Sequence, residues 1–199
     1  MMETQTVVSE KAFRTHRFLR PVQNVRVATQ SETHASCRNL VQRDYARKGY
    51  TVSGNSEKSA TTFYIGDDSQ VAATISVIED SSHGLPLDQI FGDYANSFRS
   101  SGKKLAEVGK FATDPDSSRI GLRAATMQLL SKVLQFAVDT EVDVLCITVN
   151  PKHVSFYITL GFSCDDSERV HPTVNAPARF LYFEIDKWLH HQPISGTIQ

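Results

Sequence analysis

The order of elements along the chain predicts one mixed α/β domain built on a central, partly parallel sheet. Strand patterns alternate with helical ones, and a near-continuous apolar run, residues 142–149, follows the longest amphipathic helix. A strand that is apolar on both sides is typical of the interior of a sheet with helices on both faces. With 199 residues, of which 40% are apolar, the chain suits a single layered domain with a sizeable core.

Local signals place each element. Thr29 and Glu32 have the spacing of a capping box, which predicts the start of the first helix, and Gly49 predicts its end. A Gly-Asp-Asp-Ser turn at 66–69 separates two alternating segments and predicts a hairpin. The expected strands cover residues 25–29, 61–65, 71–78, 105–112, 142–149 and 180–185, and the expected helices cover 29–48, 122–139 and 150–160.

Composition divides the chain into an arm, a domain and a tail. Residues 1–24 carry Thr, Arg and Gln without a clear period and are expected to form an N-terminal arm. Residues 25–189 hold the patterned elements, and residues 190–199 are expected to form a flexible tail. No internal repeat or interdomain linker interrupts the patterned part, so one domain is expected.

Charge and composition argue against several classes of protein. The formal net charge is −1, which gives no overall attraction to nucleic acid or to an anionic membrane. The N-terminus lacks the apolar core of a signal peptide, and no run approaches the ~20 apolar residues of a membrane span. Cys37, Cys146 and Cys164 are widely spaced and the histidines lack ligand motifs, so neither a disulfide framework nor a metal is expected. A cytoplasmic protein without a nucleic-acid partner or an integral membrane segment is the resulting expectation.

The C-terminal third holds the most informative motif. The apolar strand ends at Asn150, and the string Asn-Pro-x-His-x-x-Phe-Tyr-x-x-Leu-Gly-Phe covers residues 150–162. This segment resembles the part of GNAT-superfamily acyltransferases in which a strand ends in Asn, a short helix carries Tyr, and Gly-Phe follows. The whole string is more specifically similar to the N-acyl amino acid synthase family. Those enzymes are relatives of the acyl-homoserine-lactone synthases that take acyl chains from acyl carrier protein.

Further segments extend the resemblance over about residues 25 to 185. Residues 106–115 are similar to the family's strand that carries a Glu ahead of the long helix. Residues 85–91 resemble a family insertion, and residues 26–29 fit the start of the first helix. The resemblance implies a GNAT-type α/β fold, in which the middle strands of a mixed central sheet splay apart between flanking helices.

The loop before the long helix departs from the superfamily pattern. Acetyl-CoA enzymes carry Arg/Gln-x-x-Gly-x-Gly/Ala here, whose backbone N–H groups hold the CoA pyrophosphate. This chain has Ser-Arg-Ile-Gly-Leu-Arg over residues 118–123, with only the middle glycine retained and Arg123 at a position that favours a small residue. A weak pyrophosphate site suits an enzyme that uses carrier protein, whose phosphopantetheine presents one phosphodiester; the alternative is a diverged loop that still binds CoA.

Amide formation from a thioester needs a base for the ammonium, a donor for the carbonyl oxygen and a proton for the departing thiolate. The resemblance points to Glu107 as the base, acting directly or through a water, while strand alternation leaves its facing open and a solvated sheet residue is the alternative. Gly109 marks either a β-bulge that offers an oxyanion donor or a plain strand glycine. Tyr157 either protonates the thiolate or packs beside Phe156 in the core.

Substrate contacts are expected from the strand end and the helix starts. Asn150 and His153 lie where GNAT enzymes open their cleft, and His153 either contacts substrate or is a half-exposed residue of a helix start. Arg26, near the first helix, and Arg123, in the first turn of the long helix, complete this set.

An insertion between Ser81 and Lys103 carries large apolar side chains outside the predicted sheet. They either wall a pocket for a long acyl chain or form a second core over one sheet edge. The pocket is favoured, because a long chain needs a tunnel that acetyl transfer does not. The side chains concerned are Leu85, Leu87, Ile90, Phe91, Tyr94 and Phe98.

The resemblance implies an N-acyltransferase that moves a long-chain acyl group from acyl carrier protein to an amino acid by direct attack. An acyl thioester is then a co-substrate, no cofactor is bound, and no covalent enzyme intermediate is expected, since no Cys or Ser stands beside an evident base. Two alternatives stay open: an acetyl-CoA-dependent N-acetyltransferase, and a non-catalytic domain that binds an acyl ligand or a partner protein. Candidate docking residues for the acidic carrier protein are Arg14, Arg17, Arg20, Arg43 and Arg47.

Overall fold

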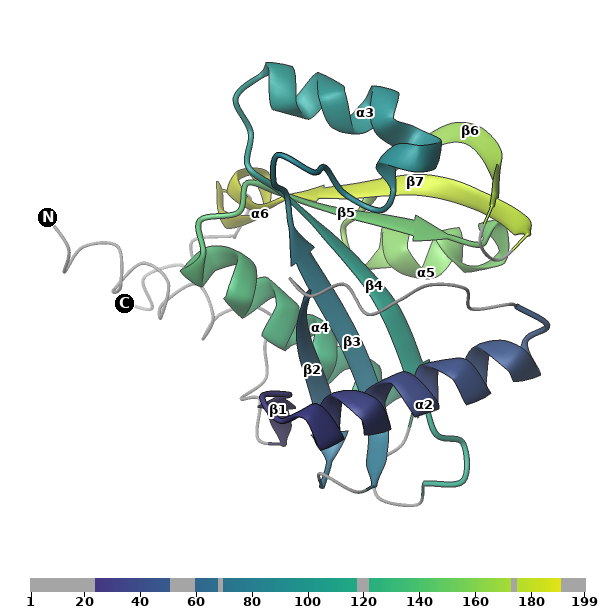
Figure 1. Cartoon of the computed structure of the whole chain (residues 1–199). Helices are drawn as coiled ribbons and strands as arrows, with labels where there is room; N and C mark the ends of the chain where they lie inside the picture. Colours follow the sequence, from purple (N-terminus) through teal and green to yellow (C-terminus); the bar gives the residue numbers. More distant parts are fainter. Residues whose placement is uncertain (1–23, 51–59, 68–69, 118–121, 173–174, 191–199) are drawn as a thin grey trace, which may run out of the picture.

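The computed structural model describes residues 24–50, 60–67, 70–117, 122–172 and 175–190. Within these ranges, seven strands form one mixed sheet with helices on both faces (Figure 1). In spatial order the strands are β1 (Val25–Val27), β2 (Ala60–Gly66), β3 (Val71–Glu79), β4 (Leu105–Thr113), β5 (Val144–Val149), β7 (Ala176–Glu184) and β6 (Ser163–His171). The helical elements are α2 (Ser31–Arg47), α3 (Asp88–Ser100), α4 (Leu122–Asp139), the 3-10 turn η1 (Pro151–His153), α5 (Val154–Thr159) and α6 (Ile185–His190).

The middle of the sheet opens between β4 and β5. These strands run parallel and pair at three positions, Leu105 with Val144, Ala106 with Leu145, and Glu107 with Cys146. Both strands continue beyond this pairing, β4 to Thr113 and β5 to Val149, so they diverge after Glu107. The mixed sheet with splayed middle strands confirms the predicted fold class.

A β-bulge in β4 increases this divergence. Ser76 of β3 pairs with Gly109, and Thr74 pairs with Ala112, so a single β3 residue lies opposite two residues of β4. The first of the two, Lys110, has a left-handed backbone with φ of +53°. A bulge bends its strand and strengthens the local twist, which turns the second half of β4 away from β5.

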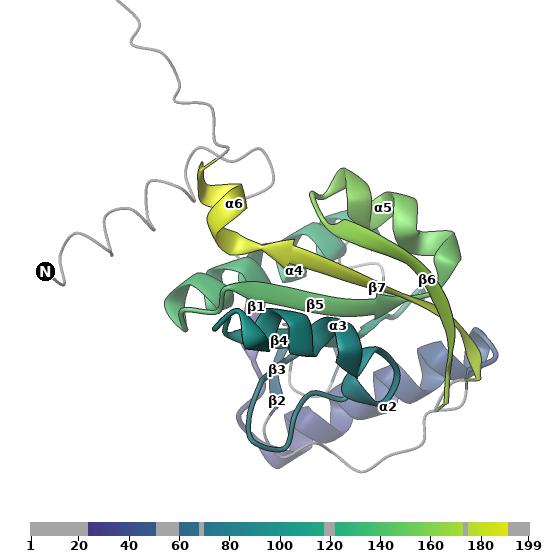
Figure 2. The same cartoon turned by 90° about the horizontal axis from the view of Figure 1, so that it is seen from above.

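Two layers of helices cover the sheet. Helices α4 and α5 lie on one face and α2 and α3 on the other, as the view from above shows (Figure 2). The main core lies between α4 and the sheet, where Leu129 and Val133 meet Phe63 and Leu145. On the opposite face α2 covers the β2–β4 half and α3 covers the β5–β7 half (Figure 1).

Several element boundaries differ from the sequence prediction. The predicted capping box is wrong: α2 begins at Ser31, and its N-cap, Gln30, is extended without a side-chain capping bond. Strand β7 begins at Ala176, four residues earlier than expected, while β6 and α6 were not predicted. Strand β6 is polar because it is the edge strand, with side chains alternating between exposed and half-buried. The expected arm and tail fall almost wholly outside the described residues.

Candidate active site

A cleft of about 340 Å³ opens where β4 and β5 diverge. Its walls come from the second half of β4, the end of β5 and helices on both faces of the sheet. The polar and charged side chains among its lining residues are Tyr45, Lys48, Tyr50, Ser76, Glu107, Lys110, Thr148, Asn150, His153, Tyr157 and His171.

A larger hollow, of about 720 Å³, lies beside α2 and the segment after β4. Its lining is polar and includes Arg43 and Asp114, whose side chains form an ion pair of 3.6 Å. None of the three candidate catalytic residues lines it, whereas Glu107, Gly109 and Tyr157 all line the cleft between the strands. The cleft is therefore the candidate active site.

Glu107 is a buried carboxylate in the wall of the cleft, with 8% of the residue exposed. Its Oε2 accepts a hydrogen bond of 2.7 Å from the backbone N–H of Leu87, twenty residues away in the insertion. Burial raises the pKa of the neighbouring Cys146 thiol, and the negative charge of Glu107 raises it further. The thiol beside Glu107 thus stays protonated at neutral pH and is a poor nucleophile.

Gly109 lies just before the β4 bulge, at the edge of the cleft. The bulge expected from this glycine is present, with its extra residue at Lys110 or Phe111. Apart from Gly109 and its two chain neighbours, no described residue has a heavy atom within 4 Å of the position that a Cβ on Gly109 would take. A ligand can therefore approach the backbone closely at this point.

Tyr157 reaches the cleft from α5, which begins after a capped turn. The Asn150 side chain accepts a hydrogen bond of 3.2 Å from the Lys152 N–H, so the end of β5 leads directly into η1. The Tyr157 ring packs edge-to-face against Phe156 and Phe162, at centroid distances of 5.2 and 5.6 Å. Burial raises the pKa of the Tyr157 phenol, which keeps it protonated and able to donate.

His153 and Asn150 also line the cleft, next to cationic side chains. The pKa of His153 is lowered, first by burial and then by the positive charges of Lys152 and Lys48. Its imidazole is therefore neutral at pH 7 and can accept a proton.

Four of the candidate substrate-binding residues do not reach the cleft. Arg26 is exposed on the edge strand β1, and Arg123 is exposed in the first turn of α4. Phe91 is fully buried and packs on Phe180 at 5.8 Å between ring centroids. Tyr94 stacks on the same ring, and its hydroxyl hydrogen-bonds Asp165 and Ser167 of β6 at 2.6 Å each.

The insertion therefore forms a second core and not the favoured acyl pocket. Helix α3 directs its apolar side chains onto β5 and β7, where they fill the space over the sheet. Within the insertion, Pro86 is the residue that lines the cleft. Two further predictions are not covered: residues 118–121 of the weak pyrophosphate loop at 118–123, and the arginines of the arm, fall outside the described residues.

Sequence reasoning missed several residues that line the cleft. Tyr45 of α2 lines the cleft; burial raises the pKa of its phenol, and a negative charge on Tyr157 would raise it further. Lys48 is the C-cap residue of α2, and its ammonium pairs with Asp44 at 2.6 Å. His171 comes from β6, an element whose polar sequence gave no strand signal.

The splayed parallel pair and a cleft with a buried carboxylate and three phenols define an N-acyltransferase with a GNAT-type fold. A sequence model for the N-acyl amino acid synthase FeeM matches residues 36–184, well over half of the chain. The chain belongs to the FeeM family of N-acyl amino acid synthases.

Solved structures agree with this assignment. FeeM from uncultured soil microbes, an N-acyl amino acid synthase, is 33% identical with a TM-score of 0.76, and the match covers 86% of this chain and 100% of FeeM. The AHL synthase LasI, at 16% identity and a TM-score of 0.62, shares the fold over 87% of this chain and 98% of its own. Escherichia coli ElaA shares it at 10% identity and a TM-score of 0.58, over 81% and 100% of the two chains. No curated protein sequence matches the chain.

The described part of the chain also bears on membrane insertion and metal binding. None of the helices in the described ranges has the length and apolar character needed to cross a bilayer. Nor do three or more His, Cys, Asp or Glu side chains gather there in a way that suits a metal ion.

Proposed function

We propose that the protein transfers a long-chain acyl group from the thioester of an acyl carrier protein to the amine of an amino acid. Membership of the N-acyl amino acid synthase family supports this acceptor class. The observation that carries the proposal is that Glu107, Gly109 and Tyr157 line one cleft between the diverging strands.

In this proposal the amine attacks the thioester directly. Glu107 takes the proton of the ammonium, itself or through a water, and the nitrogen then forms a bond to the carbonyl carbon. The backbone at Gly109 donates to the oxyanion, which the open space beside this residue allows. The C–S bond breaks, Tyr157 gives its proton to the thiolate, and the second proton of the attacking nitrogen passes to the Tyr157 phenolate, directly or through a water. Glu107 then releases its proton to solvent, so the amide and the thiol form with the net release of one proton.

The remaining polar groups of the cleft are assigned to binding. Asn150 and His153, at the end of β5, contact the substrates. Arg123 is exposed in the first turn of α4, and we assign it an outer contact with the phosphodiester of the pantetheine arm. Arg26, Phe91 and Tyr94 are left out of the substrate contacts because they do not line the cleft.

The partner in this proposal is an acidic carrier protein, which approaches the C-terminal end of α2. Arg47, Lys48 and Lys152 are exposed on or beside the cleft-lining segments and supply positive charge there. We also propose that the protein acts in the cytoplasm, where cysteines stay reduced; Cys37, Cys146 and Cys164 are all free thiols.

The test is a comparison of acyl donors. The purified protein is given acetyl-CoA, a long-chain acyl-CoA or a long-chain acyl carrier protein, together with the twenty amino acids, and products are identified by mass. The expected result is a long-chain N-acyl amino acid formed fastest from the carrier protein, and its loss in Glu107→Gln. Acetylated product from acetyl-CoA would overturn the proposal in favour of an acetyltransferase, and binding without turnover by any donor would favour a non-catalytic domain.

A further inference from the structure

The partner of Glu107 belongs to a tightly braced turn outside the sheet. The Leu87 N–H that donates to Glu107 Oε2 lies between β3 and α3, in a turn that runs from Leu85 to Asp88. Leu87 is 1% exposed, so water does not compete with its N–H for the Glu107 oxygen. The position of the Glu107 carboxylate therefore depends on how this turn is held.

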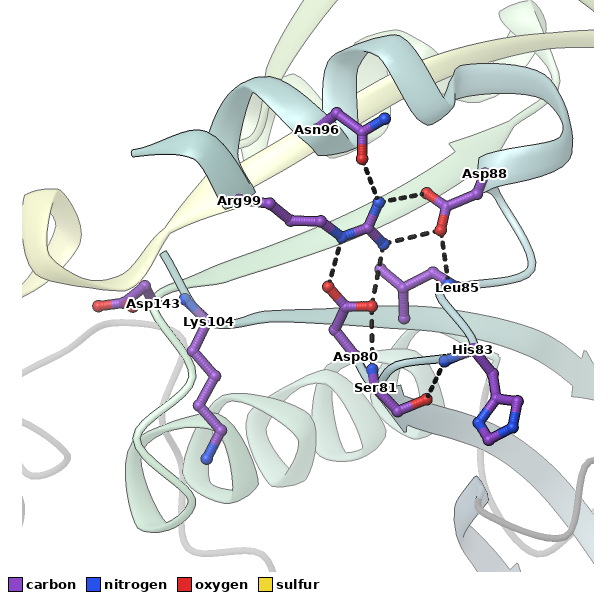
Figure 3. A network of polar contacts seen from close by, with 9 residues as sticks. All are labelled: Asp80, Ser81, His83, Leu85, Asp88, Asn96, Arg99, Lys104 and Asp143. Carbon is purple, nitrogen blue, oxygen red and sulfur yellow. Dashed lines mark hydrogen bonds and ion pairs between the residues drawn. The ribbon is translucent and has the colours of Figure 1, made fainter. Parts of the chain in front are cut away.

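Arg99, at the other end of α3, holds the turn through two carboxylates (Figure 3). Its Nε and Nη2 donate to the two oxygens of Asp80 at 2.6 and 2.9 Å. Its Nη1 and Nη2 donate to the two oxygens of Asp88 at 3.0 and 2.7 Å, and Nη1 also donates to Asn96 at 2.8 Å. The guanidinium has five N–H groups, and these five contacts use all of them.

The two carboxylates connect Arg99 to both ends of the segment that carries Leu87. Asp88 Oδ2 accepts a second hydrogen bond, of 2.7 Å, from the Leu85 N–H, and this bond closes the turn. A Cβ at Gly84 would lie 2.4 Å from the same Asp88 oxygen, so a side chain at this position does not fit unless the carboxylate moves. At the other end, the Asp80 N–H donates to the Leu105 carbonyl at 3.0 Å, two residues before Glu107 on β4.

A second arginine supplies a comparison on the same helix. Arg169 of β6 makes a bidentate pair with Asp93, at 2.8 and 2.6 Å, donates to the Ile90 carbonyl and lies over the rings of Phe91 and Tyr94. It fixes α3 to the sheet without a contact to the turn around Leu87. Arg169 thus docks α3 on the sheet, whereas Arg99 closes the turn.

We propose that Arg99 is a positioning residue for Glu107, acting through Asp88 and the Leu87 N–H. The part of this inference that concerns turnover rests on the proposed function. Arg99 does not line the cleft, so it contacts neither substrate. Arg99 holds the turn whose Leu87 N–H fixes one oxygen of the Glu107 carboxylate. The direction in which the other oxygen faces the acceptor amine is thereby set.

The test compares Arg99→Lys with Arg169→Lys. Lysine keeps the charge but cannot form two bidentate pairs at once. With the acyl donor found active above, Arg99→Lys is expected to lower kcat about 10- to 100-fold while the KM values change less than about twofold. The two variants are expected to lower Tm by similar amounts. Arg169→Lys is expected to leave kcat within about twofold of the parent.

A double-mutant cycle separates positioning from a general loss of structure. In the Glu107→Gln background, adding Arg99→Lys is expected to change kcat less than about threefold, because the group that it positions is already gone. Equal losses of kcat in the two lysine variants would overturn the proposal. A full additional loss in the Glu107→Gln background would do so as well.

One readout does not depend on turnover. Hydrogen exchange of the Leu87 amide, followed by NMR, is expected to accelerate at least tenfold in Arg99→Lys and to stay unchanged in Arg169→Lys. Unchanged exchange in Arg99→Lys would overturn the positioning role even for an active enzyme. If instead no donor gives turnover but the exchange result is as expected, the proposed function fails and the positioning of Glu107 stands.

Discussion

The two sides of the cleft are held in different ways. Glu107 lies within the three-residue parallel pairing of β4 and β5 and has the Leu87 N–H above it, inside a turn braced by Arg99. Tyr157 lies on a six-residue helix after a 3-10 turn, and every residue of that helix is exposed or half-buried. One candidate proton carrier is thus set in the core of the sheet, and the other sits near the surface.

This difference matches the chemistry that each side is proposed to perform. A base must meet a small amine in one geometry, and small displacements cost rate. The acid must serve the end of a long pantetheine arm that enters and leaves in each cycle. Because α5 makes few buried contacts, its local opening costs less free energy, which suits this traffic. We therefore expect substitutions on the Glu107 side to lower kcat more than matched substitutions on the α5 side.

Replacing the carboxylate gives the largest expected effect. Glu107→Gln keeps the shape and an oxygen that accepts from Leu87 but removes the base, so kcat should fall about 10²- to 10⁴-fold with Tm nearly unchanged. Steady-state kinetics and thermal unfolding measure the two quantities. Glu79→Gln, at the exposed end of β3, is the matched control. Activity close to the parent in Glu107→Gln would remove Glu107 from the mechanism.

The phenol on the opposite side should matter less. Tyr157→Phe keeps the ring contacts with Phe156 and Phe162, and a thiolate is a good leaving group, so a loss of about 10- to 100-fold in kcat is expected. Tyr45→Phe is the informative companion, because the Tyr45 phenol lines the same cleft from α2. A larger loss in Tyr45→Phe than in Tyr157→Phe would transfer the acid role to Tyr45.

The free energy of unfolding provides a further comparison of the two sides, between the core under α3 and the surface of α5. Phe91→Leu should lower the free energy of unfolding by about 0.5–3 kcal/mol, since Phe91 is 0% exposed. Phe156→Leu on α5, where Phe156 is 40% exposed, should cost less. Denaturant unfolding gives both values. The preferred acyl length should stay the same in Phe91→Leu, and a shift in that preference would restore Phe91 to the acyl pocket.

The smallest expected effect is a titration beside the cleft. The folded-state pKa of His153 lies below its unfolded value of about 6.5, because burial and then Lys152 and Lys48 disfavour the imidazolium. As pH falls, the unfolded chain is protonated first, so the contribution to stability is present above pH of about 6.5 and is lost as pH falls through the folded pKa. Lys152→Met should raise the pKa of His153 in an NMR titration, and Lys104→Met should not. An unchanged pKa in Lys152→Met would contradict the assigned cause.

Much of the fold follows from local sequence signals. The long helix α4 has the predicted bounds, because its apolar stripe over residues 122–139 has a clear helical period. Strand β6 could not be found this way, since an edge strand pairs on one side only and tolerates charge at nearly every position. Capping-box spacing at Thr29 was misleading because the chain enters α2 from β1 through an extended Gln30.

The candidate site was only partly accessible from sequence. Period-two alternation says that Leu105 and Glu107 share a face, but it does not say what lies on that face. The answer comes from Leu87, which lies beside Glu107 because the insertion and α3 pack over the sheet. The same packing makes Phe91 and Tyr94 core residues, and their apolar character suits a buried helix face as well as a pocket.

The order of Gly109 and Lys110 has a consequence for how this protein can change. A left-handed backbone at a non-glycine residue costs about 1–2 kcal/mol, and here Lys110 occupies that conformation while the glycine stands one place earlier. Exchanging the two would relax the backbone, but it would also fill the open space beside residue 109 and move the ammonium at the cleft. Heat-resistant variants of this chain should therefore be easy to obtain at the bulge and should be slower catalysts, a local conflict between durability and turnover.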